Sequence, residues 1–290
     1  MKRKLLYIVN PISGVNDKGA LKKIIEKETR NAGFAYGIYP SVQGGDYAHL
    51  YPIIKTEKYT DVIIAGGDGT INQAIHSLRD QHVQFGIIPC GSGNGLARAL
   101  KIRLGRRDAV RTLNRLQTVK IDTGAFNGHS FYNMAGIGFD AHISSCFAGI
   151  AKRGFQGYVK TAFTEITRYE PESYVIDIDG HRIERTAFMI SLANSSQFGN
   201  NAHVAPKASL RDGLLDVCII KPFPLYHFPV MGLHMFTRTA DRSRYVEIIK
   251  GRDIRITRTH PGAVHVDGEP ITMGSELEVT VKPLNLEVLI

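Results

Sequence analysis

Residues 63–75 read "IIAGGDGTINQAI", in which an apolar run is followed by a glycine-rich turn and the start of an amphipathic segment. The apolar run predicts a buried strand and the amphipathic segment predicts a helix. Gly66, Gly67 and Gly69 permit positive φ angles and a close approach of the backbone to a ligand. The free N–H groups of the following helix would point at the turn, where they can bind phosphate. The lysine of the commonest phosphate loop is absent, however, and Asp68 stands in the middle of the turn.

A second stretch, "GIIPCGSGNGLARAL" at 86–100, repeats the order of strand, glycine-rich turn and helix. We expect two such turns on successive parallel strands to be adjacent at one edge of a sheet, where a nucleoside triphosphate could lie between them. Ser92 and Asn94 add polar side chains to the second turn. A third turn, in "IVNPISG", follows the first predicted strand and should lie at the same edge. It carries Asn10, Pro11, Ser13 and Gly14.

The pattern of predicted secondary structure changes near Thr123. Before that point predicted strands and helices alternate, which indicates right-handed crossovers and a largely parallel sheet. After it, short β-branched segments bounded by turns predict an antiparallel sandwich or barrel-like domain. We therefore predict domains at 1–124 and 125–290, with the final residues able to pack back on the first domain.

Several elements are predicted with definite boundaries. A helix is predicted over 70–80 with Thr70 as its N-cap residue. The segment 129–140 is predicted as a strand followed by a turn, and a helix is expected over 157–170. The last two strands are predicted at 276–283 and 285–290.

The composition describes a basic protein with an ample core. The 290 residues are 43% hydrophobic, the net charge is +9 and the isoelectric point is about 9.4. Basic side chains concentrate in 98–120 and 238–258, and an anionic lipid surface attracts such patches with about 1 kcal/mol per residue. Solvated helix and strand faces explain these charges equally well. Nucleic acid is not expected as a partner, because neither interleaved aromatics nor a helix-turn-helix pattern accompanies the charge.

The three cysteines, Cys90, Cys146 and Cys218, lie in apolar settings without the spacing of metal ligands. They are predicted to be buried reduced thiols in a reducing compartment. The histidines also lack a metal-ligand spacing, and no apolar run approaches the roughly 20 residues of a membrane span. The basic start of the chain is read as a first strand rather than a signal peptide. Together these features predict a cytoplasmic protein with peripheral membrane association.

Six motifs occur in a fixed order along the chain. They are "NPxSG", "GGDGTIN", "PCGSGNGLARAL", "NxxxxGxD" from Asn133 to Asp140, "SLRDGLLDV" and "VDGEP". Together they resemble the lipid kinase superfamily of diacylglycerol kinases and sphingosine kinases over nearly the whole chain, at the length of a stand-alone bacterial member. The Walker pattern and the protein-kinase motifs are absent. The resemblance implies an N-terminal Rossmann-like parallel-sheet domain of NAD kinase/diacylglycerol kinase type and a C-terminal antiparallel β-sandwich domain.

The resemblance also implies a nucleotide site and a catalytic set. The "GGDGT" turn would bind the phosphates of ATP, and Asp68 would act near Mg²⁺ or the acceptor hydroxyl. Glu269 of the "DGE" motif corresponds to the proposed general base and Asp122 to the acid at the domain junction; whether Glu269 or Asp68 takes the proton stays open. The implied nucleotide contacts are Asn10, Ser41, Gly66, Gly67, Asp68, Gly69, Thr70, Asn72, Ser92 and Asn94.

A structural Mg²⁺ site is the last implication of the resemblance. It maps to the carboxylate of Asp212 with the backbone carbonyls of Ser209 and Leu214. One residue departs from the bacterial pattern: Gly95 follows Asn94 where bacterial diacylglycerol kinases usually have an aspartate. The sequence "GSGNGLA" is more similar to sphingoid and ceramide kinases, so neither the metal network nor the lipid follows from the motif.

The predicted function is ATP- and Mg²⁺-dependent phosphorylation of a membrane lipid alcohol of the diacylglycerol or sphingoid-base type. A basic surface would contact an anionic membrane. Two other functions stay open, namely a soluble-metabolite kinase of NAD-kinase type and a nucleotide-binding regulator without catalysis. The Asp-Gly pairs of "VDGEP" and "RDGLLD" could also be plain turns. Exposed edge strands leave a homodimer open.

Overall fold

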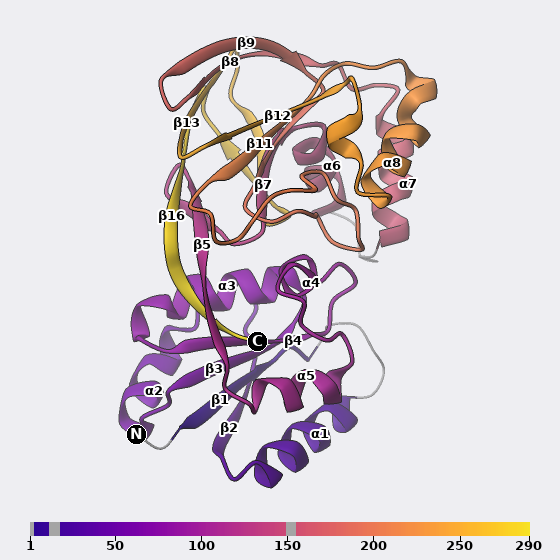
Figure 1. Cartoon of the computed structure of the whole chain (residues 1–290). Coiled ribbons are helices and arrows are strands. Elements are labelled where there is room, and N and C mark those ends of the chain that lie inside the picture. The colour runs from indigo at the N-terminus through magenta and orange to yellow at the C-terminus, as the bar shows by residue number, and fades with distance from the viewer. Residues whose placement is uncertain (1–2, 12–17, 149–154) are drawn as a thin grey trace. The chain divides into compact units, whose positions relative to one another are not determined.

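The protein folds into two compact units. The computed structural model describes residues 3–11, 18–148 and 155–290, so Ser13 and Gly14 of the first turn lie outside the described residues. The first unit comprises Met1–Ile121 and Leu286–Ile290, and the second comprises Asp122–Asn285. The chain passes between the units within two strands, β5 (Thr118–Phe126) and β16 (Glu276–Leu289), which are coloured magenta and yellow in Figure 1.

The first unit is built on a parallel sheet in the order β2-β1-β3-β4. Every residue of β3 is buried, as expected for a strand covered on both faces. The end of β16 adds Val288 and Leu289 in parallel beside β4. These strands are β1 (Lys4–Val9), β2 (Ala35–Pro40), β3 (Asp61–Gly66) and β4 (Gln84–Pro89).

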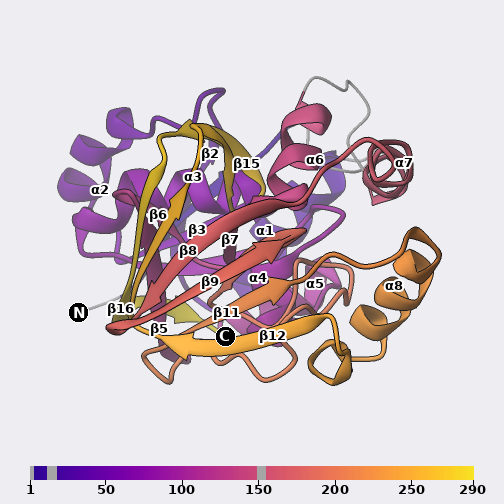
Figure 2. The same ribbon diagram turned by 90° about the horizontal axis from the view of Figure 1, so that it is seen from above.

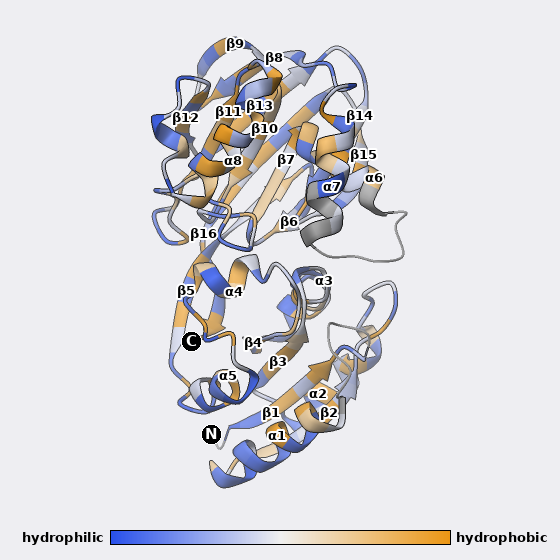
Figure 3. Cartoon of the chain, turned by 90° about the vertical axis from the view of Figure 1, so that its right-hand side faces the viewer, coloured by the Kyte–Doolittle hydropathy of each residue, from blue (hydrophilic) through white to orange (hydrophobic). Residues whose placement is uncertain are grey.

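Helices cover both faces of this sheet, as Figure 3 shows, with α1 and α5 on one face and α2 and α3 on the other. Glu28 of α1 joins Arg111 of α5 at 2.9 Å between Oε2 and Nε, which ties the first pair together. The helices are α1 (Lys18–Asn31), α2 (Tyr51–Glu57), α3 (Asp68–Leu78), α4 (Gly95–Ala99) and α5 (Arg106–Leu113).

The start of α3 corrects one prediction. The helix begins at Asp68 with Gly67 as the N-cap residue, two positions before the expected start at Thr70. Gly67 has an extended backbone (φ −91°, ψ 178°), and its carbonyl accepts the N–H of Ile71 at 3.0 Å. Glycine is an accepted N-cap residue, and it leaves the Asp68 side chain in the first helical turn.

The second unit contains two sheets of mainly antiparallel strands (Figure 2). One has the order β12-β11-β10-β7-β14-β15, and in the other β16 pairs with β13, which continues to β8 and β9. A single apolar cluster joins residues from both sheets, including Ile137, Ile176, Val217 and Ile256. The parallel-sheet unit and the β-sandwich unit confirm the predicted fold class.

The remaining strands and helices of the second unit have the following bounds. The strands are β6 (His129–Phe131), β7 (Met134–Gly138), β8 (Glu172–Ile178), β9 (His181–Ala187), β10 (Met189–Ala193), β11 (Leu215–Ile220), β12 (Val246–Gly251), β13 (Asp253–Arg258), β14 (Gly262–Val266) and β15 (Glu269–Met273). The helices are α6 (Phe139–Ala148), α7 (Phe155–Glu165) and α8 (Phe228–Phe236). Within the described residues, none of the helices has the length and apolar character needed to span a bilayer.

Two predictions in the second unit were wrong. Residues Phe139–Ala148 form helix α6, where only a turn had been expected at the end of the preceding strand. Asp140 stabilises the start of α6, because its Oδ1 accepts the N–H of Ala141 at 2.8 Å. The two last predicted strands are one continuous strand, β16. Leu284 has a positive φ of 47°, and its N–H donates to Asp122 at 2.7 Å, so the strand is distorted there without ending.

Candidate functional site

The carboxyl edge of the first sheet gathers the predicted nucleotide-binding turns. Val9 is paired with Pro40 on one side and Ala65 on the other, and Gly66 is paired with Pro89. This register brings the residues that follow β1, β2, β3 and β4 to one edge, among them Asn10 and Ser41. The expected adjacency of the glycine-rich turns is therefore confirmed by the pairing of the strands.

The "GGDGT" turn is fixed by the turn that follows β1. Asn10 Nδ2 donates to Thr70 Oγ1 at 2.7 Å, so the two turns share a hydrogen bond. A Cβ on Gly66 would lie 2.7 Å from the Cβ of Thr70, so only glycine fits beneath this threonine. Asp68 is the first residue of α3 and therefore lies where the N–H groups of the helix remain unused by the helix itself. Asn72 is half-buried in the next turn of α3.

The second glycine turn is shaped by the side chain of Asn94. This residue has a left-handed backbone (φ 50°), its Oδ1 accepts the N–H of Gly91 at 2.9 Å, and its Nδ2 donates to the Gly91 carbonyl at 2.8 Å. Arg98, which the motif did not single out, supports the same turn, since its Nε donates to the Gly93 carbonyl at 3.0 Å. Asn94 thus closes the turn, whereas Ser92 is exposed at its tip.

The two glycine turns touch each other. A Cβ on Gly91 would lie 2.7 Å from the Cα of Gly67, and a Cβ on Gly93 would lie 3.0 Å from Asp68 Oδ2. A side chain at position 91 would therefore collide with the backbone of the opposite turn, and one at position 93 would crowd the Asp68 carboxylate. The result is a cradle of bare backbone with one carboxylate beside it, which suits close approach of a phosphate chain.

In the second unit, the "VDGEP" motif forms a hairpin turn between β14 and β15. Asp267 and Gly268 have φ angles of 48° and 85°, as a two-residue hairpin requires. The Asp267 carboxylate accepts three backbone N–H groups, at 2.9 Å from Tyr132, 2.9 Å from Asn133 and 2.8 Å from Met134. Asp267 therefore fixes the hairpin to the start of β7. Glu269, the predicted base, follows the turn as the half-buried first residue of β15.

The buried side chain of His265 stabilises the same hairpin. His265 Nε2 lies 3.0 Å from Asp140 Oδ2, and the N–H of Gly268 donates to His265 Nδ1 at 3.3 Å. Because Nδ1 accepts, Nε2 carries the proton that is donated to Asp140. A Cβ on Gly136 would lie 2.5 Å from Asp140 Oδ2, which explains the glycine at this position. The sequence did not reveal this pair, since its two members lie 125 residues apart.

Asp122 is fully buried, and main-chain groups occupy both of its carboxylate oxygens. Oδ2 accepts the N–H of Gly213 at 2.7 Å, and Oδ1 accepts the N–H of Leu284 at 2.7 Å. Asn194 Nδ2 also donates to the Asp122 carbonyl at 2.9 Å. These contacts favour a positioning role for Asp122, which holds the "RDGLLD" turn and the distorted part of β16; a role in the chemistry itself stays a prediction.

The predicted Mg²⁺ ligands lie in the turn that Asp122 holds. Asp212 Oδ2 is 2.6 Å from the ammonium of Lys250, and the same ammonium is 3.5 Å from the buried Asp216. Asp212 Oδ1 accepts the N–H of Leu214 at 3.2 Å, and Ser209 Oγ accepts that of Arg211 at 3.3 Å. Lys250 thus supplies the positive charge that a metal ion would bring, so the residues as they stand do not fit a bound Mg²⁺.

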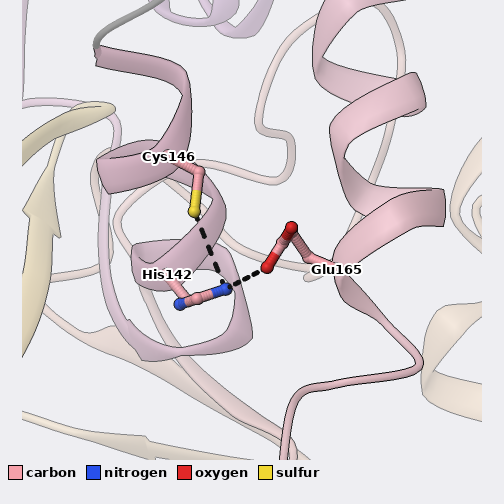
Figure 4. Close-up of side chains that lie close together, drawn as sticks. All are labelled: His142, Cys146 and Glu165. Atoms are coloured by element: carbon pink, nitrogen blue, oxygen red, sulfur yellow. Dashed lines mark hydrogen bonds and ion pairs between the residues drawn. The ribbon is translucent and has the colours of Figure 1, made fainter.

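A further group of possible metal ligands joins α6 to α7 (Figure 4). His142 Nε2 lies 2.9 Å from Glu165 Oε2 and 3.7 Å from Cys146 Sγ. Although Cys146 is exposed, the partial desolvation of its thiol, followed by the charge of Glu165, raises the pKa of that thiol, so the thiol form is favoured. Cys90 and Cys218 are buried as expected, but Cys146 is exposed, which corrects the prediction for that residue. It lies on the outer side of α6, whose existence the sequence had not shown.

Comparison with known proteins identifies the family. Residues 4–126 match the model of the diacylglycerol kinase catalytic domain, and residues 133–290 match that of the YegS C-terminal NAD kinase beta sandwich-like domain. The chain belongs to the diacylglycerol kinase-like family of lipid kinases. Six residues, 127–132, separate the two matched ranges, near the boundary of the two units.

Relatives of this lipid kinase family extend over most of the chain. A "Diacylglycerol kinase" of Bacillus subtilis (strain 168) is 28% identical over 279 residues, which cover 93% of this chain and 90% of the relative. A "Diacylglycerol kinase" of Staphylococcus carnosus (strain TM300) is 25% identical over 93% of this chain and 89% of the relative. The crystal structure of a diacylglycerol kinase from Bacillus anthracis (strain Sterne) superposes with a TM-score of 0.75 at 19% identity, covering 99% and 96% of the two chains; it shares the fold.

Proposed function

We propose that this lipid kinase transfers the γ-phosphate of ATP to the hydroxyl group of a membrane lipid of the diacylglycerol or sphingoid-base type. The observation that carries the proposal is the contact between the two glycine turns at the sheet edge, with Asp68 at the start of α3. The family supports a kinase in general. The choice of acceptor follows from the similarity to named diacylglycerol kinases, and Gly95 leaves the sphingoid alternative in the test.

The first unit is proposed to bind ATP. The backbone N–H groups at the start of α3 and in the second glycine turn would bind the phosphates, because both offer donors without side chains in the way. Asn10 holds Thr70 in place and Arg98 holds the second turn, so neither turn has to reorganise when the anion binds. Ser92, exposed at the tip of the second turn, is a further donor toward the nucleotide.

Asp68 is proposed to hold the magnesium ion that accompanies ATP. Its carboxylate lies beside the phosphate cradle rather than within it, so it can face a cation while the backbone faces the anion. When bound, Mg²⁺ neutralises charge on the transferred phosphoryl group. Asp68 and Glu269 are the two candidates for orienting and deprotonating the lipid hydroxyl.

The second unit is proposed to contribute Glu269. The Asp267 carboxylate and the His265–Asp140 pair fix the hairpin that carries Glu269, so the backbone of Glu269 has a rigid support. Glu269→Gln should reduce kcat by a larger factor than it changes KM, because the amide preserves the shape of the side chain but cannot accept a proton.

A lipid panel tests the proposal. Purified protein receives ATP and Mg²⁺ with mixed micelles that contain diacylglycerol, a sphingoid base or ceramide, and ADP and the phosphorylated lipid are measured. We expect lipid-dependent release of ADP with one acceptor class. NAD without detergent serves as the soluble-metabolite arm. Turnover of NAD alone, or ATP binding without turnover of any alcohol, would refute the proposal.

A further inference from the structure

Helix α8 and the short 3₁₀ turn before it, Leu225–His227, form an exposed surface without formal charge. Residues 225–237 contain no Asp, Glu, Lys or Arg. The inner side of the helix is anchored, since Met231 is buried and Phe228 packs against Phe139. The outer side leaves large apolar residues exposed, namely Leu225 (54%), Tyr226 (76%), Val230 (43%), Leu233 (62%) and Phe236 (49%).

Tyr226, Val230, Leu233 and Phe236 share one side of the helical segment, because their spacing of three to four positions matches the helical repeat. Leu225 directly precedes Tyr226 in the 3₁₀ turn. Phe163 of α7, which is 55% exposed, extends the surface, as its ring centroid is 5.1 Å from that of Phe228. Figures 1 and 2 both show α7 and α8 at the same end of the second unit. We call this surface the docking face; it consists of Phe163, Leu225, Tyr226, Val230, Leu233 and Phe236.

The docking face differs from the outer sides of other helices. The exposed positions of α1 and α5 include lysine, arginine and aspartate side chains, as is usual for a helix in water. Six large apolar side chains on α7, on α8 and on the turn before α8 form a surface of the kind that is normally covered by a partner or a membrane. A helix with one apolar side and aromatic residues at its border is typical of binding in the plane of a bilayer.

The charges around α8 indicate the partner. Arg238, Arg242 and Arg244 are exposed and follow the helix directly. This segment packs on the end of α8, since the N–H of Thr239 donates to the His234 carbonyl at 2.9 Å.

The acids of this region are already paired. Asp241 lies 2.8 Å from Lys207, and Glu247 lies 3.0 Å from both Arg185 and Lys221. The charge left at the border of the docking face is therefore positive, which is complementary to anionic lipid head groups and not to an uncharged apolar protein surface.

We propose that the docking face binds an anionic phospholipid bilayer, with Leu233 and Phe236 entering the acyl region and the arginines contacting lipid phosphates. Its use by the enzyme rests on the proposed function, because a membrane is where a lipid alcohol would be found. The binding itself requires no turnover and can be measured without it.

Vesicle sedimentation of the full chain tests the proposal. Vesicles of phosphatidylcholine with phosphatidylglycerol should retain the wild-type protein, and Leu233→Ser combined with Phe236→Ser should lower the partition coefficient by about a hundredfold, since each change removes one large apolar contact. Leu104→Ser, at another exposed leucine, is the matched control and should bind as the wild type. Circular dichroism of each variant establishes that it is folded.

Substitution of the arginines is an independent test of the proposed membrane binding. Arg242→Gln and Arg244→Gln should each weaken binding to the anionic vesicles by about fivefold and leave binding to pure phosphatidylcholine unchanged. Wild-type protein that does not sediment with anionic vesicles, or a double variant that binds as well as Leu104→Ser, would overturn the proposal. A wild-type dimer that the double variant converts to a monomer would also overturn it, since the face would then be an interface between copies of the chain.

A second readout separates this proposal from the proposed function. With a short-chain diacylglycerol dissolved as monomers, the double variant should turn over substrate at the wild-type rate, and only its activity on vesicles should fall. Vesicle binding without kinase activity on any lipid would support the docking face and refute the proposed function. Kinase activity on vesicles that is equal in the wild type and the double variant would refute the docking face alone.

Discussion

Asp68 and Asp267 both stand beside a glycine in a tight turn, yet the two carboxylates are used differently. Asp267 accepts three backbone N–H groups and fixes the hairpin of β14 and β15. Asp68 is the first residue of α3 and lies next to the contact between the two glycine turns. The same pair of letters, Asp-Gly, therefore marks a structural support in the second unit and a candidate ligand-binding acid in the first. The surroundings of the carboxylate, rather than the motif, decide which it is.

The largest expected effect is on activity at Asp68. Asp68→Asn should lower kcat about a thousandfold, because the amide keeps the shape of the side chain but loses the charge that faces the metal or the hydroxyl. Thermal unfolding should remain within about a degree of the wild type. Asp80→Asn, at an acid whose side chain is 88% exposed, is the control. Full activity of Asp68→Asn would place Asp68 outside the mechanism.

The converse is expected at Asp267. Asp267→Ala removes three charge-assisted hydrogen bonds, which should lower the free energy of unfolding by about 3 kcal/mol. Chemical denaturation measures this, and hydrogen exchange should show the loss of protection at Tyr132, Asn133 and Met134. An unchanged stability together with lost activity would make Asp267 a second functional acid and would remove the contrast between the two turns.

Lys250 tests whether an ammonium group replaces a metal ion beside Asp212. Burial raises the pKa of Asp216, and Lys250 partly opposes this shift, so Lys250→Met should lower the free energy of unfolding by about 1–2 kcal/mol. The expected loss of stability is modest because the Lys250 side chain is 37% exposed to solvent, which screens its charge. A chelator should not change the melting temperature of the wild type. A fall in that temperature on chelation, restored by Mg²⁺, would instead support the metal site at Ser209, Asp212 and Leu214.

The smallest effect concerns Glu247, which joins β12 to β9 through Arg185. The hydrogen bond from Arg185, with further help from Lys221, lowers the pKa of Glu247 from 4.5 to about 2. A carboxylate whose pKa is lower in the folded state stabilises the protein above its unfolded pKa and loses this contribution as the pH falls. The stability difference between the wild type and Glu247→Gln should therefore be constant above about pH 5 and vanish toward pH 2, as urea denaturation across this range would show. A difference that persists at pH 2 would contradict the assigned cause.

The sequence predicted the parallel sheet, the β-sandwich and the adjacent glycine turns, because long apolar runs and Gly-rich turns are local signals. It did not predict helix α6, whose start depends on Asp140 and a contact with His265 far along the chain. The role of Asn94 in closing its own turn was also hidden, since the same residue type serves as a ligand or as a left-handed turn residue. The contacts of Asp122 with Gly213 and Leu284 join segments that are distant in sequence, and no periodic pattern of apolar residues in the sequence indicates such contacts.

The path of β16 has a consequence for synthesis on the ribosome. Val288 and Leu289 pair with β4, and the N–H of Ile290 donates to Gln117, although all other segments of the first unit lie before Asp122. The edge of β4 that pairs with β16 can therefore be covered only after the whole second unit has been translated. Until then the nascent chain carries an unpaired strand edge, which is a site where another chain can pair. Chaperone binding during elongation should accordingly be strongest between the emergence of β4 and that of the final residues.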